Sequence, residues 1–217
     1  QRGCTGWSYD DVLPLFQKSE TYKQGGDATY RGGNGPLQVE DYRTILPLTH
    51  TFVEAAQQAG FPLTPDYNGN LQEGVGYSQM TRRGRFRGST AQTYLRAMRD
   101  NPKLQVLTGA KAGPLIFEDR KCIGITYRQG GQNKEIRPRH EVVLCGGAYN
   151  SPQLLQISGI GPAAHLQSIG VAVRHDLPGV GSNLADHFGA RLKHRVRGTT
   201  MNQLSRFPHV VPEIAKF

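Results

Sequence analysis

Several features that define common protein classes are missing from this sequence. It has no uninterrupted apolar stretch of about 18 residues, the length of a membrane-spanning helix, so no transmembrane segment is expected. It has only three cysteines, Cys4, Cys122 and Cys145, and their spacing is not that of metal ligands. The simplest expectation is a cytoplasmic protein without a metal site, although a membrane-associated parent protein stays open.

Two catalytic or binding motifs are also missing. No strand is followed by G-x-G-x-x-G, the turn that holds the pyrophosphate of a dinucleotide. No G-x-S-x-G elbow is present, so the serines and histidines of the chain do not indicate a hydrolase. The sequence has no internal repeat and no low-complexity tract.

The composition indicates a globular protein with many turns. The chain has 217 residues, of which 37% are hydrophobic and 20% charged, and this length allows one or two domains. Glycine (27 residues) and proline (13 residues) are abundant, which favours short elements over a long helical bundle.

The net charge is +9, and its only dense cluster is Arg82, Arg83, Arg85 and Arg87. We interpret the cluster as a solvated loop punctuated by glycine. The alternative is a non-enzymatic basic binding module, whose binding to nucleic acid would weaken with salt. No aromatic-rich motif or Cys/His finger supports that alternative, and no nucleic-acid partner is expected.

The first hundred residues predict three helices and one strand among turns. Ser8 is a suitable N-cap with acidic residues in the first turn behind it, and Gly60 is a suitable stop for a helix that begins near Pro47. The predicted helices are 8–19, 45–60 and a third opened by Ser89 or Thr90, and the predicted strand lies within 35–41. Residues 25–36 and 63–88 are predicted to be loops rich in glycine and turns.

From Asn101 onwards the pattern favours strands. Strands are predicted at 104–109, twice within 113–130 and within 134–147. Val142–Cys145 is apolar without alternation, which is typical of a strand buried on both faces. Two short helices at 151–158 and 162–169 follow, and the last residues, PEIAKF, begin another helix.

The most informative unit is a strand, a double-glycine turn and a helix. Gly146 and Gly147 let the backbone turn tightly, while Ser151 and Pro152 suit the N-cap and first position of the next helix. Ligands of open α/β sheets bind at the carboxyl ends of strands, which would place Gly146, Gly147 and Ala148 beside a dinucleotide. A tight turn without a ligand is the alternative.

The segment GAYNSPQLLQISGIG, residues 147–161, resembles the second signature of the glucose-methanol-choline (GMC) oxidoreductases. The likeness lies in Gly147-Ala148, Ser151-Pro152, the aliphatic pair Leu154-Leu155 and the closing Ser158-Gly159-Ile160-Gly161. Three further segments resemble the same family in the same order: GWSYDDVLPLFQKSE (6–20), which is similar to choline dehydrogenase-like members, GSTAQTYL (88–95) and LPGVGSNLADH (177–187).

The resemblance implies an α/β fold of mixed α+β character in two parts. Residues 101–187 would belong to a Rossmann-like domain that binds FAD, and residues 1–100 to a substrate domain with an antiparallel sheet. Residues 188–217 would begin a further substrate-domain segment. The resemblance implies cofactor contacts at Ala112, through its backbone to the adenine, and at Cys145, Gly146, Gly147 and Ala148.

The implied function is that of an FAD-dependent oxidoreductase acting on CH–OH groups. A base would take the hydroxyl proton of a small alcohol while hydride moves to the flavin. None of the seven histidines matches the family's catalytic position, and His187 is interpreted as structural, so no catalytic residue is assigned. The base is expected to follow Phe217 and the pyrophosphate turn to precede Gln1.

The chain alone is therefore expected to be inactive and either to self-associate or to associate with the missing segments. A regulatory module or a decayed paralogue from the same family is the alternative.

Overall fold

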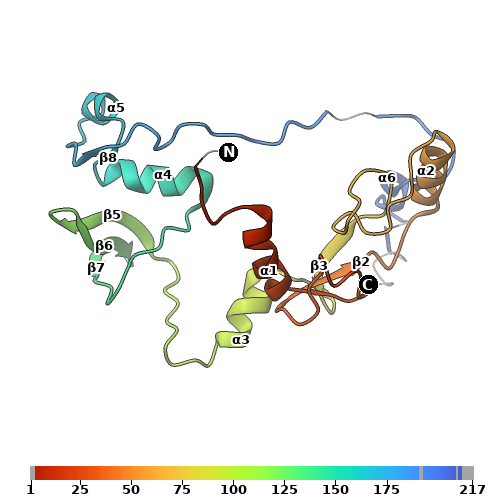
Figure 1. The fold of residues 1–217 in the computed structure, drawn as a ribbon, viewed down its shortest axis with the longest axis horizontal. Coiled ribbons are helices and arrows are strands. Elements are labelled where there is room, and N and C mark those ends of the chain that lie inside the picture. The colour runs from red at the N-terminus through yellow and green to blue at the C-terminus, as the bar shows by residue number, and fades with distance from the viewer. Residues whose placement is uncertain (1–2, 191–192, 209, 212–217) are drawn as a thin grey trace. The chain divides into compact units, whose positions relative to one another are not determined.

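The computed structural model describes residues 3–190, 193–208 and 210–211. The chain divides into two units, shown in Figure 1. Unit 1 comprises Gln1–Leu104 with His194–Phe217, and unit 2 comprises Gln105–Lys193. Each unit combines helices with a small sheet, which confirms the expected mixture of α and β structure.

Unit 1 is built on a four-stranded mixed sheet of order β1-β2-β3-β4. The strands are β1 (Glu20–Tyr22), β2 (Leu37–Asp41), β3 (Gln79–Arg83) and β4 (Phe86–Arg87). β1 runs parallel to β2, whereas β2–β3 and β3–β4 are antiparallel. The strand expected within 35–41 is confirmed as β2, and β1, β3 and β4 were not expected.

The described residues of unit 1 form five helical segments. They are α1 (Tyr9–Ser19), α2 (Pro47–Gln58), the π-helix η1 (Ala91–Leu95), α3 (Arg96–Met98) and α6 (Met201–Leu204). At the start of α1, the backbone N–H of Ser8 donates to Asp11 at 2.9 Å and the Ser8 hydroxyl accepts from the Asp11 N–H at 3.4 Å. This reciprocal cap explains why the predicted helix begins where it does.

Glycine permits a close approach between α1 and the loop before β2. A Cβ on Gly32 would lie 2.1 Å from the carbonyl oxygen of Gln17, and one on Gly35 would lie 2.1 Å from the carbonyl carbon of Ser19. Both glycines have φ angles outside the left-handed region, so the requirement here is space. The glycine-rich loop expected at 25–36 is thus confirmed and is packed against the end of α1.

Unit 2 contains a three-stranded antiparallel meander. Its strands are β5 (Lys111–Glu118), β6 (Lys121–Gln129) and β7 (Gln132–Ile136), paired in that order. Asp119 makes the turn between β5 and β6 with φ 51°, in the left-handed region that aspartate tolerates. The two strands expected within 113–130 are confirmed.

The rest of unit 2 is a helix, a short strand, a helix and a short strand. These are α4 (Gly147–Ile157), β8 (Ile160–Gly161), α5 (Ala163–Ser168) and β9 (His175–Asp176), and β8 pairs with β9 in parallel. Leu166 of α5 is fully buried. The helix expected at 151–158 begins four residues earlier, at Gly147, so the expected N-cap Ser151 lies inside it. The Ser151 hydroxyl accepts from the backbone N–H of Gly146 at 3.0 Å.

The strand predicted at 104–109 does not form, and the strand predicted within 134–147 forms only at its start, where residues 134–136 belong to β7. Residues 104–109 and Val142–Cys145 have no strand assignment, and Figure 1 draws the first as an irregular trace between α3 and β5. Residues 104–109 are exposed and the side chain of Val143 is 70% exposed. A strand buried on both faces needs a neighbouring strand on each side, and no described strand pairs with either stretch.

The interpretation of 82–87 as a solvated loop is also wrong. Arg82 and Arg83 lie on β3 and Arg87 on β4, which form a hairpin. Arg82 Nε lies 3.2 Å from Glu40 Oε1, and the Arg83 guanidinium donates to the carbonyl of Gln92. Part of the positive cluster is therefore engaged within unit 1.

Two further expectations concern the tail and the membrane. The helix expected in PEIAKF lies outside the described residues. Within the described part of the chain, no helix has the length and apolar character needed to cross a bilayer.

Candidate functional site

The double-glycine bend opens α4 and leaves its first turn exposed. Gly146 is the N-cap residue, and no side chain caps the helix there. Gly147 has φ +78°, and a Cβ built on it would find no atom within 4 Å. The backbone conformation therefore favours glycine, while the space beside Gly147 is open to a ligand.

The start of α4 suits a polar or anionic group. The N–H groups of a helix's first turn have no partner within the helix and lie at the positive end of its dipole. Cys145, Gly146, Gly147 and Ala148 are all exposed here. This arrangement fits contact with a polar group of a dinucleotide such as FAD, the cofactor that the resemblance implies.

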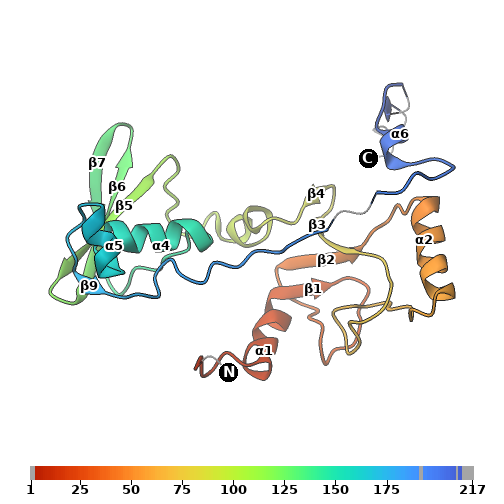
Figure 2. The same cartoon turned by 90° about the horizontal axis from the view of Figure 1, so that it is seen from above.

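The other expected cofactor residue, Ala112, lies near the start of β5. It is exposed, and β5 is an edge strand of the meander, so part of its backbone is free to face away from β6. Figures 1 and 2 show α4 lying along β5. The structure thus places all five expected residues in unit 2, on β5 and at the start of the helix that packs against it.

A cavity of about 600 Å³ lies at the opposite end of α4. None of the five expected cofactor residues lines it. Its lining consists of Pro114, Leu115, Asp119, Ile157, Ser158, Gly159, Val171, Ala172, Val173 and Arg174. The cavity and the exposed first turn of α4 are therefore separate features of unit 2.

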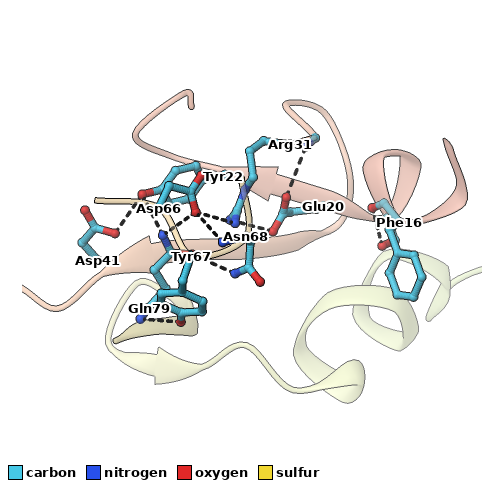
Figure 3. A network of polar contacts seen from close by, with 11 residues as sticks. Phe16, Glu20, Tyr22, Arg31, Asp41, Asp66, Tyr67, Asn68 and Gln79 are labelled. Carbon is cyan, nitrogen blue, oxygen red and sulfur yellow. Dashed lines mark hydrogen bonds and ion pairs between the residues drawn. The ribbon is translucent and has the colours of Figure 1, made fainter. Parts of the chain in front are cut away.

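Unit 1 contains a buried polar network centred on Arg31, shown in Figure 3. The Arg31 side chain is 1% exposed, and its guanidinium donates to Glu20 at 2.9 Å and to Asp66 at 3.1 Å. Its central carbon also lies 4.0 Å from the centre of the Tyr22 ring. Two carboxylates and one aromatic face thus surround a single cation.

The network continues from Tyr22 across the sheet. The Tyr22 hydroxyl donates to Asp41 at 2.9 Å and accepts from the Gln79 side chain at 3.1 Å. Gln79 also donates to Asp66, which closes the loop. Burial, followed by the bond to Asp41, raises the pKa of Tyr22 to about 12, so this phenol stays neutral and keeps donating.

The chemistry of this network bears on substrate recognition. An aromatic face flanked by carboxylates is the arrangement that binds a quaternary ammonium. Here the guanidinium of Arg31 occupies that position, so the network binds a cation that belongs to the chain itself. No local sequence pattern predicts the network, since Asp66 lies 35 residues from Arg31.

A second cluster of charges surrounds Glu40 on β2. Its carboxylate is 3% exposed and lies 2.9 Å from Lys23, 3.3 Å from Arg43 and 3.2 Å from Arg82. Burial opposes ionisation, but the bonds with Lys23 and Arg43 outweigh it and lower the pKa of Glu40. Glu40 is consequently a charged anchor for β3 and has no role suited to proton transfer near neutral pH.

The structure shows local contacts for two of the histidines, His187 and His50. The backbone N–H of His187 donates to the neighbouring Asp186 carboxylate at 2.8 Å, and the residue is exposed. His50 Nδ1 lies 2.7 Å from the hydroxyl of Tyr77. Across residues 3–190, 193–208 and 210–211, no group of three or more potential metal ligands occurs.

Comparison with known proteins places the chain in a family. The profile of the family described as GMC oxidoreductase matches residues 1–189. "Oxygen-dependent choline dehydrogenase" of Photobacterium profundum is 43% identical over 189 residues, and the protein of that name from Sinorhizobium medicae is 45% identical over 186. These alignments cover 86% and 85% of this chain but 33% of each relative, so the chain spans about a third of their length.

Comparison with solved structures supports the same family. Pyridoxine 4-oxidase from Mesorbium loti superposes with a TM-score of 0.73 at 32% identity, over 79% of this chain and 34% of the oxidase. An FAD-dependent oxidoreductase from Chaetomium thermophilum gives a TM-score of 0.75 at 26% identity, over 82% and 33%. The expected resemblance is confirmed by profile, sequence and fold together, and this chain belongs to the GMC oxidoreductase family.

Proposed function

We propose that this chain is the central part of an FAD-dependent alcohol oxidoreductase of the choline dehydrogenase type. The observation that carries the proposal is the identity of 43–45% to two oxygen-dependent choline dehydrogenases over residues that include both units. The substrate is a small primary alcohol. When bound, the flavin supplies the redox chemistry by accepting the hydride of the alcohol carbon.

Unit 2 contributes to the cofactor site in this proposal. The uncapped first turn of α4 and the open space beside Gly147 support contacts from Cys145, Gly146, Gly147 and Ala148. Ala112, exposed on the edge strand β5, would contact the adenine through its backbone. Unit 1 would form part of the substrate domain, held in shape by Arg31.

The residues of this chain bind and orient; we assign the catalytic base to none of them. None of the seven histidines matches the family's catalytic position in the sequence, and the chain spans about a third of the length of its curated relatives. The 217-residue chain alone is therefore expected to show no alcohol oxidation. A cytoplasmic location stays a prediction.

A chimera tests the proposal. Residues 1–189 replace the corresponding third of the Sinorhizobium medicae relative, and the purified chimera is assayed for bound FAD by its visible absorbance and for choline-dependent reduction of an electron acceptor. We expect the chimera to retain FAD and to oxidise choline or a related alcohol. The 217-residue chain alone, assayed in parallel with added FAD, is expected to do neither at a comparable level.

Two variants sharpen the test. Gly147→Val is expected to abolish FAD retention, because φ +78° strains a β-branched residue and its side chain would occupy the open space. Gly170→Val is the matched control, since Gly170 has φ +73° and open space but ends α5 away from the bend. A folded chimera without FAD, or equal losses in both variants, would contradict the proposal.

A further inference from the structure

Helix α4 is attached to the rest of unit 2 at its C-terminal end. The side-chain amide of Gln156 donates to the carbonyl of Val180 at 3.2 Å. The backbone N–H of Leu115, on β5, donates to the hydroxyl of Ser158 at 2.9 Å. Two separate segments, β5 and the turn around Val180, therefore meet the last turn of α4.

Ser158 is the central member of this attachment. Its hydroxyl accepts from Leu115 and donates back to the carbonyl of Leu154 at 2.6 Å, so both of its roles are used. The residue is 8% exposed, so both bonds lie in a buried environment. The serine thus ties β5 to the end of α4 through one buried oxygen.

The residue after Ser158 adds a third attachment. The carbonyl of Gly159 accepts from the backbone N–H groups of Arg174 at 2.8 Å and His175 at 3.1 Å. A Cβ on Gly159 would lie 2.6 Å from the carbonyl oxygen of Ala172, and φ is +83°. Gly159 is therefore needed for the close approach of the chain that leads into β9.

The opposite end of α4 has no such attachment among the described residues. Residues 145–150 are exposed, and the hydrogen bond there, from Gly146 N–H to Ser151, is internal to the segment. Because the hydrogen bonds to other elements lie at the C-terminal turn of α4, a small change in the helix angle there displaces the N-terminal turn. Its 11 residues span about 16 Å at 1.5 Å per residue.

We infer that Ser158 is a positioning residue for the cofactor site at the far end of α4. Its hydroxyl fixes the angle between α4 and β5, the two elements that carry Gly147 and Ala112. The inference rests on the proposed function, because it assumes that these residues contact FAD. Ser158 touches no cofactor itself and acts through the helix.

The test uses Ser158→Ala and Ser158→Thr, with Ser168→Ala as the matched control. Ser168 donates to the carbonyl of His165 within its own exposed helix end and joins no other element. In the 217-residue chain, hydrogen exchange of the Leu115 amide reports whether the bond exists. In the chimera, FAD titration gives the affinity, and turnover per bound flavin reports whether the chemistry is altered.

We expect Ser158→Ala to accelerate Leu115 exchange and to weaken FAD binding about tenfold, the equivalent of one hydrogen bond of about 1.4 kcal/mol. Turnover per bound flavin should match the parent, Ser158→Thr should restore affinity, and Ser168→Ala should change nothing. Faster Leu115 exchange with unchanged FAD affinity overturns the inference, as does failure of the threonine to restore binding. A parent chimera that holds no FAD refutes the proposed function instead, while the Leu115 result still decides whether the attachment exists.

Discussion

The two units are stabilised by different interactions. In unit 1 the buried residues include two charged side chains, Arg31 in the loop before β2 and Glu40 on β2, each surrounded by opposite charges. Unit 2 has a locally paired meander, and its most buried side chain is the aliphatic Leu166. Removing one charged side chain from unit 1 should therefore cost more than removing apolar volume from unit 2, because it leaves the partner charges buried and uncompensated.

Arg31→Ala should give the largest effect. It leaves the Glu20 and Asp66 carboxylates facing each other without a cation, so we expect a loss of about 3–5 kcal/mol in the unfolding free energy of unit 1. Hydrogen exchange in β1 and β2 would measure it. Arg99→Ala is the matched control, because Arg99 is exposed beside Asp100, and should cost less than about 0.5 kcal/mol. If Arg31→Ala costs no more unfolding free energy than Arg99→Ala, the buried ion pairs of Arg31 do not stabilise unit 1 as stated.

Leu166→Ala should rank next. Its side chain is fully buried, and deleting such a leucine typically costs about 3 kcal/mol, here confined to unit 2. Denaturant unfolding followed by hydrogen exchange in α5 is the measurement. Leu184→Ala, at a side chain that is mostly exposed, serves as the reference for truncation at the surface. Loss of protection in unit 1 as well would show that the units unfold together.

Tyr22→Phe should have a moderate and pH-dependent effect. At neutral pH it removes the bonds to Asp41 and Gln79, at a cost of about 1–2 kcal/mol. Because the folded pKa of Tyr22 is raised to about 12, its contribution is fully present below about pH 10 and is lost as pH rises through about 12. Unfolding free energies measured across this range should fall less steeply for the variant than for the parent. If the unfolding free energies of parent and variant fall equally with pH, the ionisation of Tyr22 does not cause the loss of stability.

Val143→Thr should have the smallest effect. The side chain is 70% exposed in a stretch without strand pairing, so the change should stay within about 0.5 kcal/mol. Val39→Thr on the paired and buried β2 is the counterpart and should cost about 1–2 kcal/mol, because it buries a hydroxyl. Thermal unfolding of both variants would reveal whether the 142–145 stretch is packed in solution.

The sequence predicted those elements whose signals and partners are local. The Ser8 cap sets the start of α1, Pro47 and Gly60 bound α2, and the turn at Asp119 joins two strands that pair with each other. The GMC signature located the Gly146–Ala148 bend, which the structure shows at the exposed start of α4. These features need only a few neighbouring residues.

Features that depend on distant partners were missed or wrong. The Arg31 network joins residues far apart in the chain, and the β3–β4 hairpin was hidden by a run of arginines that indicated solvent. Residues 104–109 and Val142–Cys145 have strand composition but no described strand beside them. Composition indicates what a segment is suited to form, whereas pairing decides whether it forms.

The two unpaired stretches also affect how the chain behaves at high concentration. Leu104, Val106 and Val143 are exposed in segments whose backbone N–H and C=O groups lack ladder partners, and such segments accept strands from other molecules. We therefore expect the isolated chain to scatter light as a concentration-dependent assembly, through the same apolar residues that suggested an internal sheet. We therefore expect these two stretches to pair with a strand of another polypeptide, which in a preparation of the isolated chain is a second copy.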